Sequence, residues 1–188
     1  MASERPLVGR PLVYAETRRF LHGEGTYLDD VPCPGAHHAV LVRSPHARAR
    51  ILRVDANAAR PVPGVVAVID AAALAGRLGP IRAPVGLDGY KAPPRPVLPA
   101  DEARFVGEPV AVVLARTPDA ASDAAELVRV EYEALPAVTE MEHALGPASP
   151  RVHASVPGNL VFQATQRFGD VGAAFAAADV VVEGRFHA

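Results

Sequence analysis

The sequence predicts an α+β fold, in which a small mixed sheet with packed helices occupies residues 1–157 and residues 158–188 form a linker and the first, truncated elements of a second domain. Three features support this prediction. Several β-prone runs are short, one segment reads as strand, helix and strand in succession, and the chain has 19 prolines and 15 glycines but no tryptophan. Such a composition favours short elements joined by stiff turns. With 49% hydrophobic residues, the 188-residue chain can bury a core.

The first 36 residues predict an extended leading segment. They contain few periodic apolar positions and many turn formers, namely Gly23, Gly25, Pro32, Pro34 and Gly35. We expect the order of this segment to depend on docking.

Three β-prone runs follow, at residues 38–43, 50–55 and 64–70. In the second run, apolar side chains alternate with arginines but slip by one position after Ile51. We expect the first two runs to be neighbouring strands around a loop at residues 44–46. The third run leads into an alanine-rich helix at residues 71–78.

Residues 79–99 are dense in glycine and proline. Proline removes a backbone donor and fixes φ, so continuous secondary structure is excluded there. We expect a long surface loop, which is the kind of loop that is often functional or flexible.

The clearest local signal lies at residues 109–132, which read as a strand, a helix and a strand. Thr117 is placed to accept a hydrogen bond as the helix N-cap, Pro118 suits the first helical position, and Asp119 complements the helix dipole. Four small apolar residues recur at helical spacing and predict one face packed on a sheet: Ala121, Ala124, Ala125 and Val128. After the helix, apolar and charged residues alternate as in a half-buried strand.

The C-terminal part predicts a short helix at residues 140–145 and an irregular stretch to residue 159. The remaining residues resemble the beginning of another domain, with a segment at 160–168, a helix at 171–178 capped by Asp170, and a strand at 180–186. A chain that ends within a strand leaves unpaired backbone groups, which suggests truncation or an obligate partner.

Composition limits the possible partners and the cellular setting. A net charge of -2, with 19 basic and 21 acidic residues spread along the chain, favours neither nucleic acid nor an anionic membrane. No apolar signal region follows the N-terminus, and no stretch approaches the roughly 18 apolar residues of a membrane span, so we expect a cytoplasmic protein. The single cysteine, Cys33, excludes an internal disulfide and any cysteine-based zinc or iron–sulfur site within this chain.

Two groups near the N-terminus have the residue types of binding sites. Gly23-Glu24-Gly25 is half of a dinucleotide-binding fingerprint, but Leu28 replaces the third glycine and no strand precedes the motif, so a glycine turn is favoured. Five residues could supply metal ligands: His22, Asp29, Asp30, His37 and His38. Because no pair has the i, i+4 spacing of a helical metal site, solvated turn residues are the favoured interpretation.

Three further candidates lie in or near the β-prone runs. Ser44, His46 and Asp55 have the residue types of a hydrolase triad, but no nucleophile-elbow sequence surrounds the serine and a turn is favoured. Cys33 has no basic neighbour that would lower its pKa and predicts an unreactive thiol. Four arginines could bind an anion, although a solvated strand face is favoured: Arg43, Arg48, Arg50 and Arg53.

Several longer segments match one family in their order and spacing. They are RFLHGEGTYLDD (19–30), VRSPHARARI (42–51), PGVVAV (63–68), FVGEPVA (105–111), VEYEALP (130–136), and GDV (169–171) with the AF and ADVVVEG that follow it. On these segments the chain resembles the N-terminal a/b hammerhead domain of the molybdenum hydroxylase large subunit, the family of xanthine dehydrogenase, aldehyde oxidase and carbon monoxide dehydrogenase. The resemblance covers nearly the whole chain.

The resemblance implies a place in a larger oxidoreductase. Members of this family use a molybdenum–pterin cofactor in the large subunit, and iron–sulfur clusters and FAD in further domains or subunits pass electrons onward. They hydroxylate aldehydes or N-heterocycles with oxygen from water, or oxidise carbon monoxide. Their pterin-binding loops and general-base glutamate lie downstream of this domain. We therefore assign no catalytic, cofactor-binding or metal residue in this chain, and expect it to be inactive alone.

The role implied for this chain is non-catalytic. It would pack against the remainder of the large subunit and against the iron–sulfur and flavin subunits, with no nucleic acid or membrane partner. The alternative is a stand-alone interaction or assembly module, or a truncated relic, without redox activity. A neighbouring gene that encodes the cofactor-binding part of the large subunit would favour an enzyme whose large subunit is divided between two chains.

Overall fold

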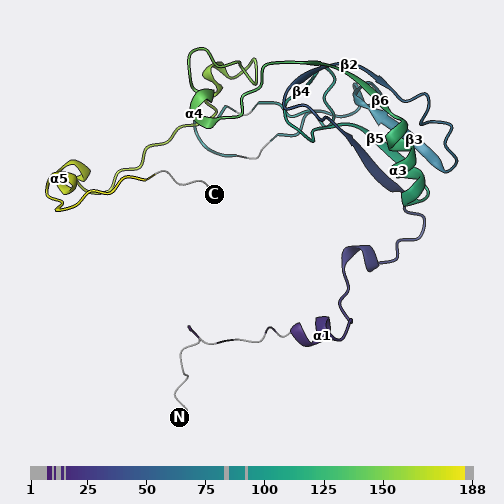
Figure 1. The fold of residues 1–188 in the computed structure, drawn as a ribbon, viewed down its shortest axis with the longest axis horizontal. Helices are drawn as coiled ribbons and strands as arrows, with labels where there is room; N and C mark the ends of the chain where they lie inside the picture. The colour runs from purple at the N-terminus through teal and green to yellow at the C-terminus, as the bar shows by residue number, and fades with distance from the viewer. Residues whose placement is uncertain are drawn as a thin grey trace, which may run out of the picture. The chain divides into compact units, whose positions relative to one another are not determined.

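The computed structural model describes residues 8–9, 11, 14, 16–82, 85–91 and 93–184 (Figure 1). The chain divides into two units, Met1–His37 and His38–Ala188. Within the described ranges, no helix has both the length and the apolar character needed to cross a membrane.

The first unit contains the helix α1 (Thr17–Leu21) and the 3-10 helix η1 (Leu28–Asp30). Arg19 Nε donates to the Glu24 carbonyl oxygen at 2.8 Å, and the rings of Phe20 and Tyr27 stack with centroids 6.2 Å apart. The expectation of an extended segment is wrong at residues 17–21. Helix prediction from sequence relies on a recurring apolar face that packs on a core. No residue of α1 is buried, so this helix needs no such face and its sequence gives no such signal.

The second unit contains two antiparallel sheets of three strands. The first has the order β1 (His38–Arg43), β5 (Pro109–Ala115), β3 (Val65–Asp70), and the second β4 (Glu102–Ala103), β2 (Ala49–Asp55), β6 (Arg129–Ala134). The α+β class is confirmed. The strands divide between two sheets instead of forming one, and the pairings among the described strands are antiparallel.

The expectation that the runs at 38–43 and 50–55 are neighbouring strands is wrong, because β1 and β2 belong to different sheets. The backbone N–H of Ser44 donates to the Glu108 carbonyl oxygen at 2.9 Å, and the N–H of Gly107 donates to the Ser44 carbonyl oxygen at 2.7 Å. These bonds hold the segment after β1 against the residues that precede β5, and the chain then continues into β2 of the second sheet. The predicted slip in β2 is a bulge, since Ile51 pairs with Tyr132 and Arg53 with Glu131.

The strand, helix and strand at 109–132 are confirmed, with α3 (Pro118–Leu127) between β5 and β6. The Thr117 hydroxyl accepts a hydrogen bond from the Ala120 N–H at 3.2 Å, as an N-cap should. The two strands lie in different sheets, so the segment is not a parallel βαβ unit. In Figure 1, α3 lies along the strands of the first sheet, against β1 and β5.

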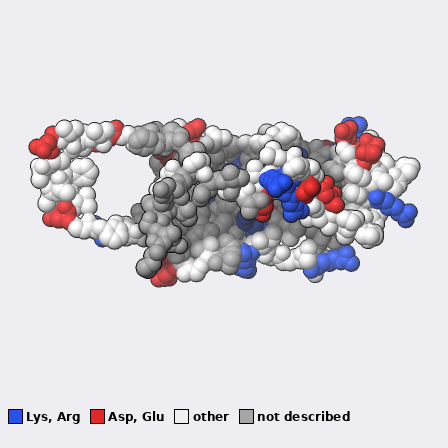
Figure 2. All heavy atoms as spheres, turned by 90° about the horizontal axis from the view of Figure 1, so that it is seen from below, with Lys and Arg blue, Asp and Glu red and all other residues white. Residues whose placement is uncertain are grey.

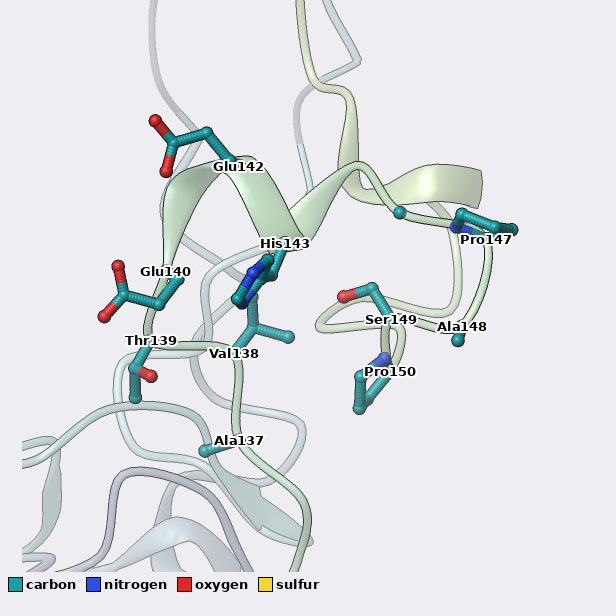
Figure 3. A pocket seen from close by; sticks show the side chains of 11 residues that line it. Ala137, Val138, Thr139, Glu140, Glu142, His143, Pro147, Ala148, Ser149 and Pro150 are labelled. Carbon is teal, nitrogen blue, oxygen red and sulfur yellow. The ribbon is translucent and has the colours of Figure 1, made fainter. Parts of the chain in front are cut away.

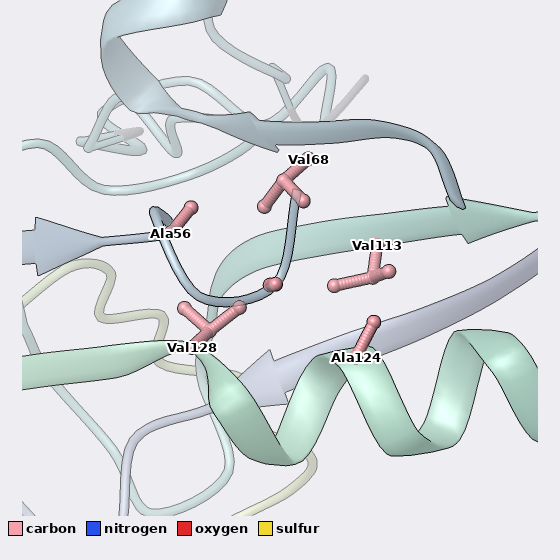
Figure 4. Packing of buried hydrophobic residues seen from close by; sticks show 6 residues of the cluster. Ala56, Val68, Val113, Ala124 and Val128 are labelled. Carbon is pink, nitrogen blue, oxygen red and sulfur yellow. The ribbon is translucent and has the colours of Figure 1, made fainter. Parts of the chain in front are cut away.

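The main core lies between α3 and the first sheet (Figure 4). Alanines on the helix let it approach the strands closely, because they add no side chain beyond Cβ. The buried residues of this core are Ala56, Ala59, Val68, Val113, Ala124 and Val128. A second cluster joins the two sheets through Ile51, Ala103 and Val110. The predicted apolar face of α3 therefore packs as expected.

The other helices are short. They are α2 (Ala71–Leu74), α4 (Met141–Ala144), η2 (Pro157–Asn159) and α5 (Val171–Ala176). The helix predicted at 71–78 is wrong beyond residue 74, where the chain turns towards Gly76 at φ 73°. The Asp170 side chain caps α5 as predicted, accepting from the Ala173 N–H at 3.0 Å.

Two irregular regions remain. In the described part of residues 79–99, one isolated bridge pairs Ile81 with Arg95, as suits the predicted loop; residues 83, 84 and 92 lie outside the described residues. Residues 180–184 are not a strand, which contradicts the strand predicted at 180–186 as far as residue 184; residues 185 and 186 lie outside the described residues. A strand needs a hydrogen-bonded neighbour, and the described chain pairs none with this segment.

The N-cap of α3 gives a first testable prediction. We expect Thr117→Ala to lower the free energy of unfolding by about 1 kcal/mol, because the Ala120 N–H loses its side-chain acceptor. Urea unfolding followed by circular dichroism measures the change. Thr139→Ala is the control, since Thr139 is exposed and lies outside the helices and strands. An equal loss in both variants would contradict a capping role.

Candidate functional site

A cluster of charged side chains lies where the second sheet meets the segment around residue 152. Arg48 Nε lies 2.9 Å from Glu102 Oε1, and Arg104 Nε lies 3.8 Å from the same oxygen. The three side chains are 16%, 20% and 22% exposed, respectively, so water screens them only in part. The Glu102 carboxylate therefore lies close to two guanidinium groups, and these three side chains together carry a net charge of one positive unit.

Backbone carbonyl groups complete the positioning of both arginines. Arg48 Nη1 donates to the Pro136 carbonyl oxygen at 3.2 Å, while Arg104 donates from Nη1 to the Glu102 carbonyl oxygen at 3.0 Å and from Nε to that of Val152 at 3.4 Å. The cluster thus ties β2, β4, the end of β6 and the segment at 152 together.

A hollow of about 370 Å³ lies beside this cluster. Its walls come from the proline-rich loop, the turn between β4 and β5, and residue 153. Arg104, Glu108 and His153 line it together with prolines and Phe105. The Glu108 carboxylate accepts the backbone N–H of Arg104, which fixes one of its oxygens.

His153 in this hollow has an altered proton affinity. Burial lowers its pKa below the ordinary value of 6.5, the nearby Arg104 charge acts in the same direction, and Glu102 acts in the opposite one. The neutral imidazole therefore predominates at pH 7.

Asn159 organises the segment that carries His153. Its Nδ2 donates to the carbonyl oxygens of Ala144 and Pro150, each at 2.9 Å, and its Oδ1 accepts the Val152 N–H at 2.9 Å. The backbone of Asn159 has φ 57°, a left-handed conformation that asparagine tolerates better than most residues. Sequence reasoning missed this residue, although Gly158-Asn159 is a typical turn pair.

A second hollow, of about 420 Å³, is formed by residues 137–150 alone (Figure 3). The carboxylates of Glu140 and Glu142 point away from Ser149 in this view. The Ser149 hydroxyl lies 3.5 Å from Asn159 Nδ2, as part of the same turn. The contacts of Ser149 and Asn159 explain the shape of the turn without a chemical role.

The structure does not assemble Ser44, His46 and Asp55 into a triad. The His46 backbone N–H donates to Ser44 Oγ at 3.2 Å, which is a turn contact and not an imidazole contact. The His46 ring instead packs edge-on against Tyr132, with centroids 5.0 Å apart. The Asp55 carboxylate accepts the Asn57 N–H at 3.0 Å.

Tyr132 gives a second prediction. Its hydroxyl oxygen is buried and forms no hydrogen bond of good geometry among the described residues. Burial raises its pKa above 10, and a weak contact with the Ser44 hydroxyl, too poor in geometry to count as a hydrogen bond, lowers it by less. We expect Tyr132→Phe to raise the free energy of unfolding at pH 7 by up to about 1 kcal/mol, because an unpaired buried group is removed.

The pH dependence follows from the raised pKa. The folded chain holds the phenol proton at pH values where the unfolded chain has lost it. The stability that this proton binding gives the folded state is therefore complete below pH 10, and it is lost as pH rises through the folded pKa. Denaturation of both proteins between pH 7 and 11 should show the advantage of the phenylalanine variant growing above pH 10. A variant less stable at pH 7 would show that the hydroxyl is satisfied.

The N-terminal candidates behave as turn residues. Within the described ranges, no three His, Cys, Asp or Glu side chains come close enough to hold a metal ion, and Asp30 instead accepts the Tyr27 N–H at 2.9 Å. Gly23 and Gly25 follow α1, and a Cβ on Gly25 would lie 2.9 Å from Phe20 Cδ1. Cys33 is exposed.

Each of the four arginines singled out in the sequence has an internal partner. Arg43 Nη1 donates to the Gly107 carbonyl oxygen at 2.8 Å, Arg50 pairs with Glu133, Arg53 pairs with Asp55 at 2.9 Å, and Arg48 pairs with Glu102. Blue and red side chains lie near one another on the face in Figure 2. Three of these arginines form internal ion pairs and Arg43 bonds a backbone carbonyl oxygen, so the four do not form an assembled anion site.

Comparison with known proteins shows similarity over nearly the whole chain. Residues 22–136 match the family described as aldehyde oxidase and xanthine dehydrogenase, a/b hammerhead domain. The nicotine 6-hydroxylase large subunit of Paenarthrobacter nicotinovorans is 36% identical over 183 residues, which are 97% of this chain and 22% of that protein. The carbon monoxide dehydrogenase large chain of Afipia carboxidovorans is 37% identical over 145 residues, covering 77% of this chain and 17% of that one.

A solved structure shows the same arrangement. Quinoline 2-oxidoreductase from Pseudomonas putida 86 superposes with a TM-score of 0.81 and 38% identity, over 93% of this chain and 22% of that one. The chain therefore spans about a fifth of the length of such relatives.

Proposed function

Because the chain belongs to the a/b hammerhead domain family of aldehyde oxidases and xanthine dehydrogenases, we propose that it is the non-catalytic N-terminal portion of a molybdenum hydroxylase large subunit. The complete cytoplasmic enzyme would oxidise an aldehyde, an N-heterocycle or carbon monoxide. This portion would support the packing of the cofactor-binding domains and the assembly of the subunits.

The exposed apolar surface of residues 160–184 is the observation that carries this proposal. Phe168, Phe175 and Val182 are 83%, 60% and 88% exposed, respectively, and α5 has no buried residue. This segment is anchored at its start, where the Lys91 N–H donates to the Val161 carbonyl oxygen at 2.9 Å. Large apolar side chains exposed together are typical of a surface that another domain covers.

The ligand types in this chain argue against an iron–sulfur cluster held by this chain alone. Iron–sulfur clusters are held by at least two cysteine thiolates, and the sequence has one cysteine. No three candidate ligands converge in the described ranges. From membership of the family, we propose that the molybdenum–pterin cofactor lies in the remainder of the large subunit, and the iron–sulfur clusters and FAD in partner subunits.

Metal analysis of purified protein tests the proposal. The chain is purified alone and after co-expression with any large-subunit fragment encoded downstream, and each sample is examined by metal mass spectrometry and oxidase assays. We expect molybdenum and activity in the co-purified complex only. Molybdenum in the isolated chain would overturn the non-catalytic role. Neither binding nor metal in either sample would favour a stand-alone module or relic.

A matched variant separates docking from a loss of folding. Phe168 and Phe175 are exposed, so replacing both by serine should leave the unfolding transition of the isolated chain within about 0.5 kcal/mol of the original. The same variant should lose co-purification with the downstream fragment. Retained co-purification would show that this surface is not the docking site.

A further inference from the structure

The hollow beside Arg104 combines apolar walls with unused cationic donors. Ile81, Val97 and Phe105 line it, and all three are exposed large apolar side chains. Two backbone hydrogen bonds between Ile81 and Arg95, with nitrogen–oxygen distances of 2.7 and 3.4 Å, hold together the part of the proline-rich loop that lines the hollow. A volume of about 370 Å³ falls within the range of small-ligand sites.

The charges around the hollow leave one positive charge uncompensated. Arg95 and Arg104 line the hollow together with one carboxylate, that of Glu108. Arg48 and Glu102 lie outside the lining and pair with each other. Among the described residues, the Arg95 guanidinium has no hydrogen bond or ion pair, while Arg104 uses Nε and Nη1 and leaves Nη2 available. His153 is predominantly neutral at pH 7, because burial and the Arg104 charge lower its pKa.

We propose that this hollow binds a single carboxylate attached to a compact apolar group. A guanidinium matches the planar geometry of a carboxylate, and one excess positive charge balances one negative charge. Phe105 and the proline side chains of the loop would contact the apolar part. A free acid or the acidic side chain of a docked polypeptide has this chemistry, and the inference holds whether or not the chain belongs to a hydroxylase.

Titration of the isotopically labelled 188-residue chain followed by NMR tests the site. The probes are benzoate, its neutral analogue benzamide, and the blocked peptides acetyl-Val-Glu-Val-amide and acetyl-Val-Gln-Val-amide. We expect saturable shifts at the amides of Val97, Phe105 and His153 with a carboxylate probe, and weaker binding of the matching neutral probe. Tighter binding of benzoate identifies a free acid, and tighter binding of the glutamate peptide identifies a docked segment.

Two variants locate the charge that matters. We expect Arg95→Gln to weaken binding of the preferred probe by about fivefold, the upper effect of an exposed ion pair. Arg60→Gln removes an exposed arginine that does not line the hollow and should leave the affinity unchanged. Equal binding of carboxylate and neutral probes, shifts outside the hollow, or an equal effect of both variants would overturn the proposal.

Discussion

Replacing Glu102 by glutamine is expected to lower the free energy of unfolding by about 2 kcal/mol, because two largely buried arginines lose the carboxylate that they share. The full penalty for breaking a buried pair is larger, but these side chains keep about a fifth of their surface in contact with water. Urea unfolding at pH 7 and low salt measures the change.

Glu133→Gln is the matched control for this prediction. Glu133 pairs with Arg50 across β2 and β6, but the two side chains are 51% and 56% exposed, so we expect a loss of at most about 0.5 kcal/mol. Added salt should reduce that small loss further, because exposed charges are screened. Similar losses in both variants would show that burial does not strengthen the Glu102 cluster.

Local signals in the sequence were sufficient for most single elements. Thr117, Pro118 and Asp119 act within one turn of α3, and Asp170 acts within one turn of α5, so their effect depends on neighbours in the sequence. The slip after Ile51 likewise appears in the sequence because a bulge shifts the alternation of side chains.

The division into two sheets could not be predicted from such signals. It depends on hydrogen bonds from Ser44 to residues 107 and 108, more than 60 positions away along the chain. The apolar pattern of a strand shows which of its residues are buried, but it does not identify the partner strand.

The candidate site was missed for the same reason. Arg104 and His153 are 49 positions apart in sequence and line one hollow because Asn159 shapes the intervening turn. A lone arginine and a lone histidine give no motif at that separation. The sequence did identify Arg48 as part of an arginine cluster, but its Glu102 partner required the pairing of β2 with β4.

Val113→Ala is expected to cost about 2 kcal/mol of unfolding free energy, through lost burial and the cavity left behind. Val113 lies on the central strand β5 with no exposed surface, between β1 and β3, and packs in the cluster that contains Ala124 of α3. The small side chains around it cannot extend to fill the space (Figure 4). The decrease in the urea midpoint, at an unchanged slope, measures this cost.

Val66→Ala removes the same atoms from the neighbouring strand β3 and is the control. Val66 is 49% exposed, so we expect a loss of about 0.5 kcal/mol, in line with other surface substitutions. The difference between the two variants reports packing, because both remove a β-branched side chain from a strand. If Val113→Ala cost no more than Val66→Ala, α3 would not be packed tightly on the first sheet, and the sheet would have to be stabilised by its strand pairings alone.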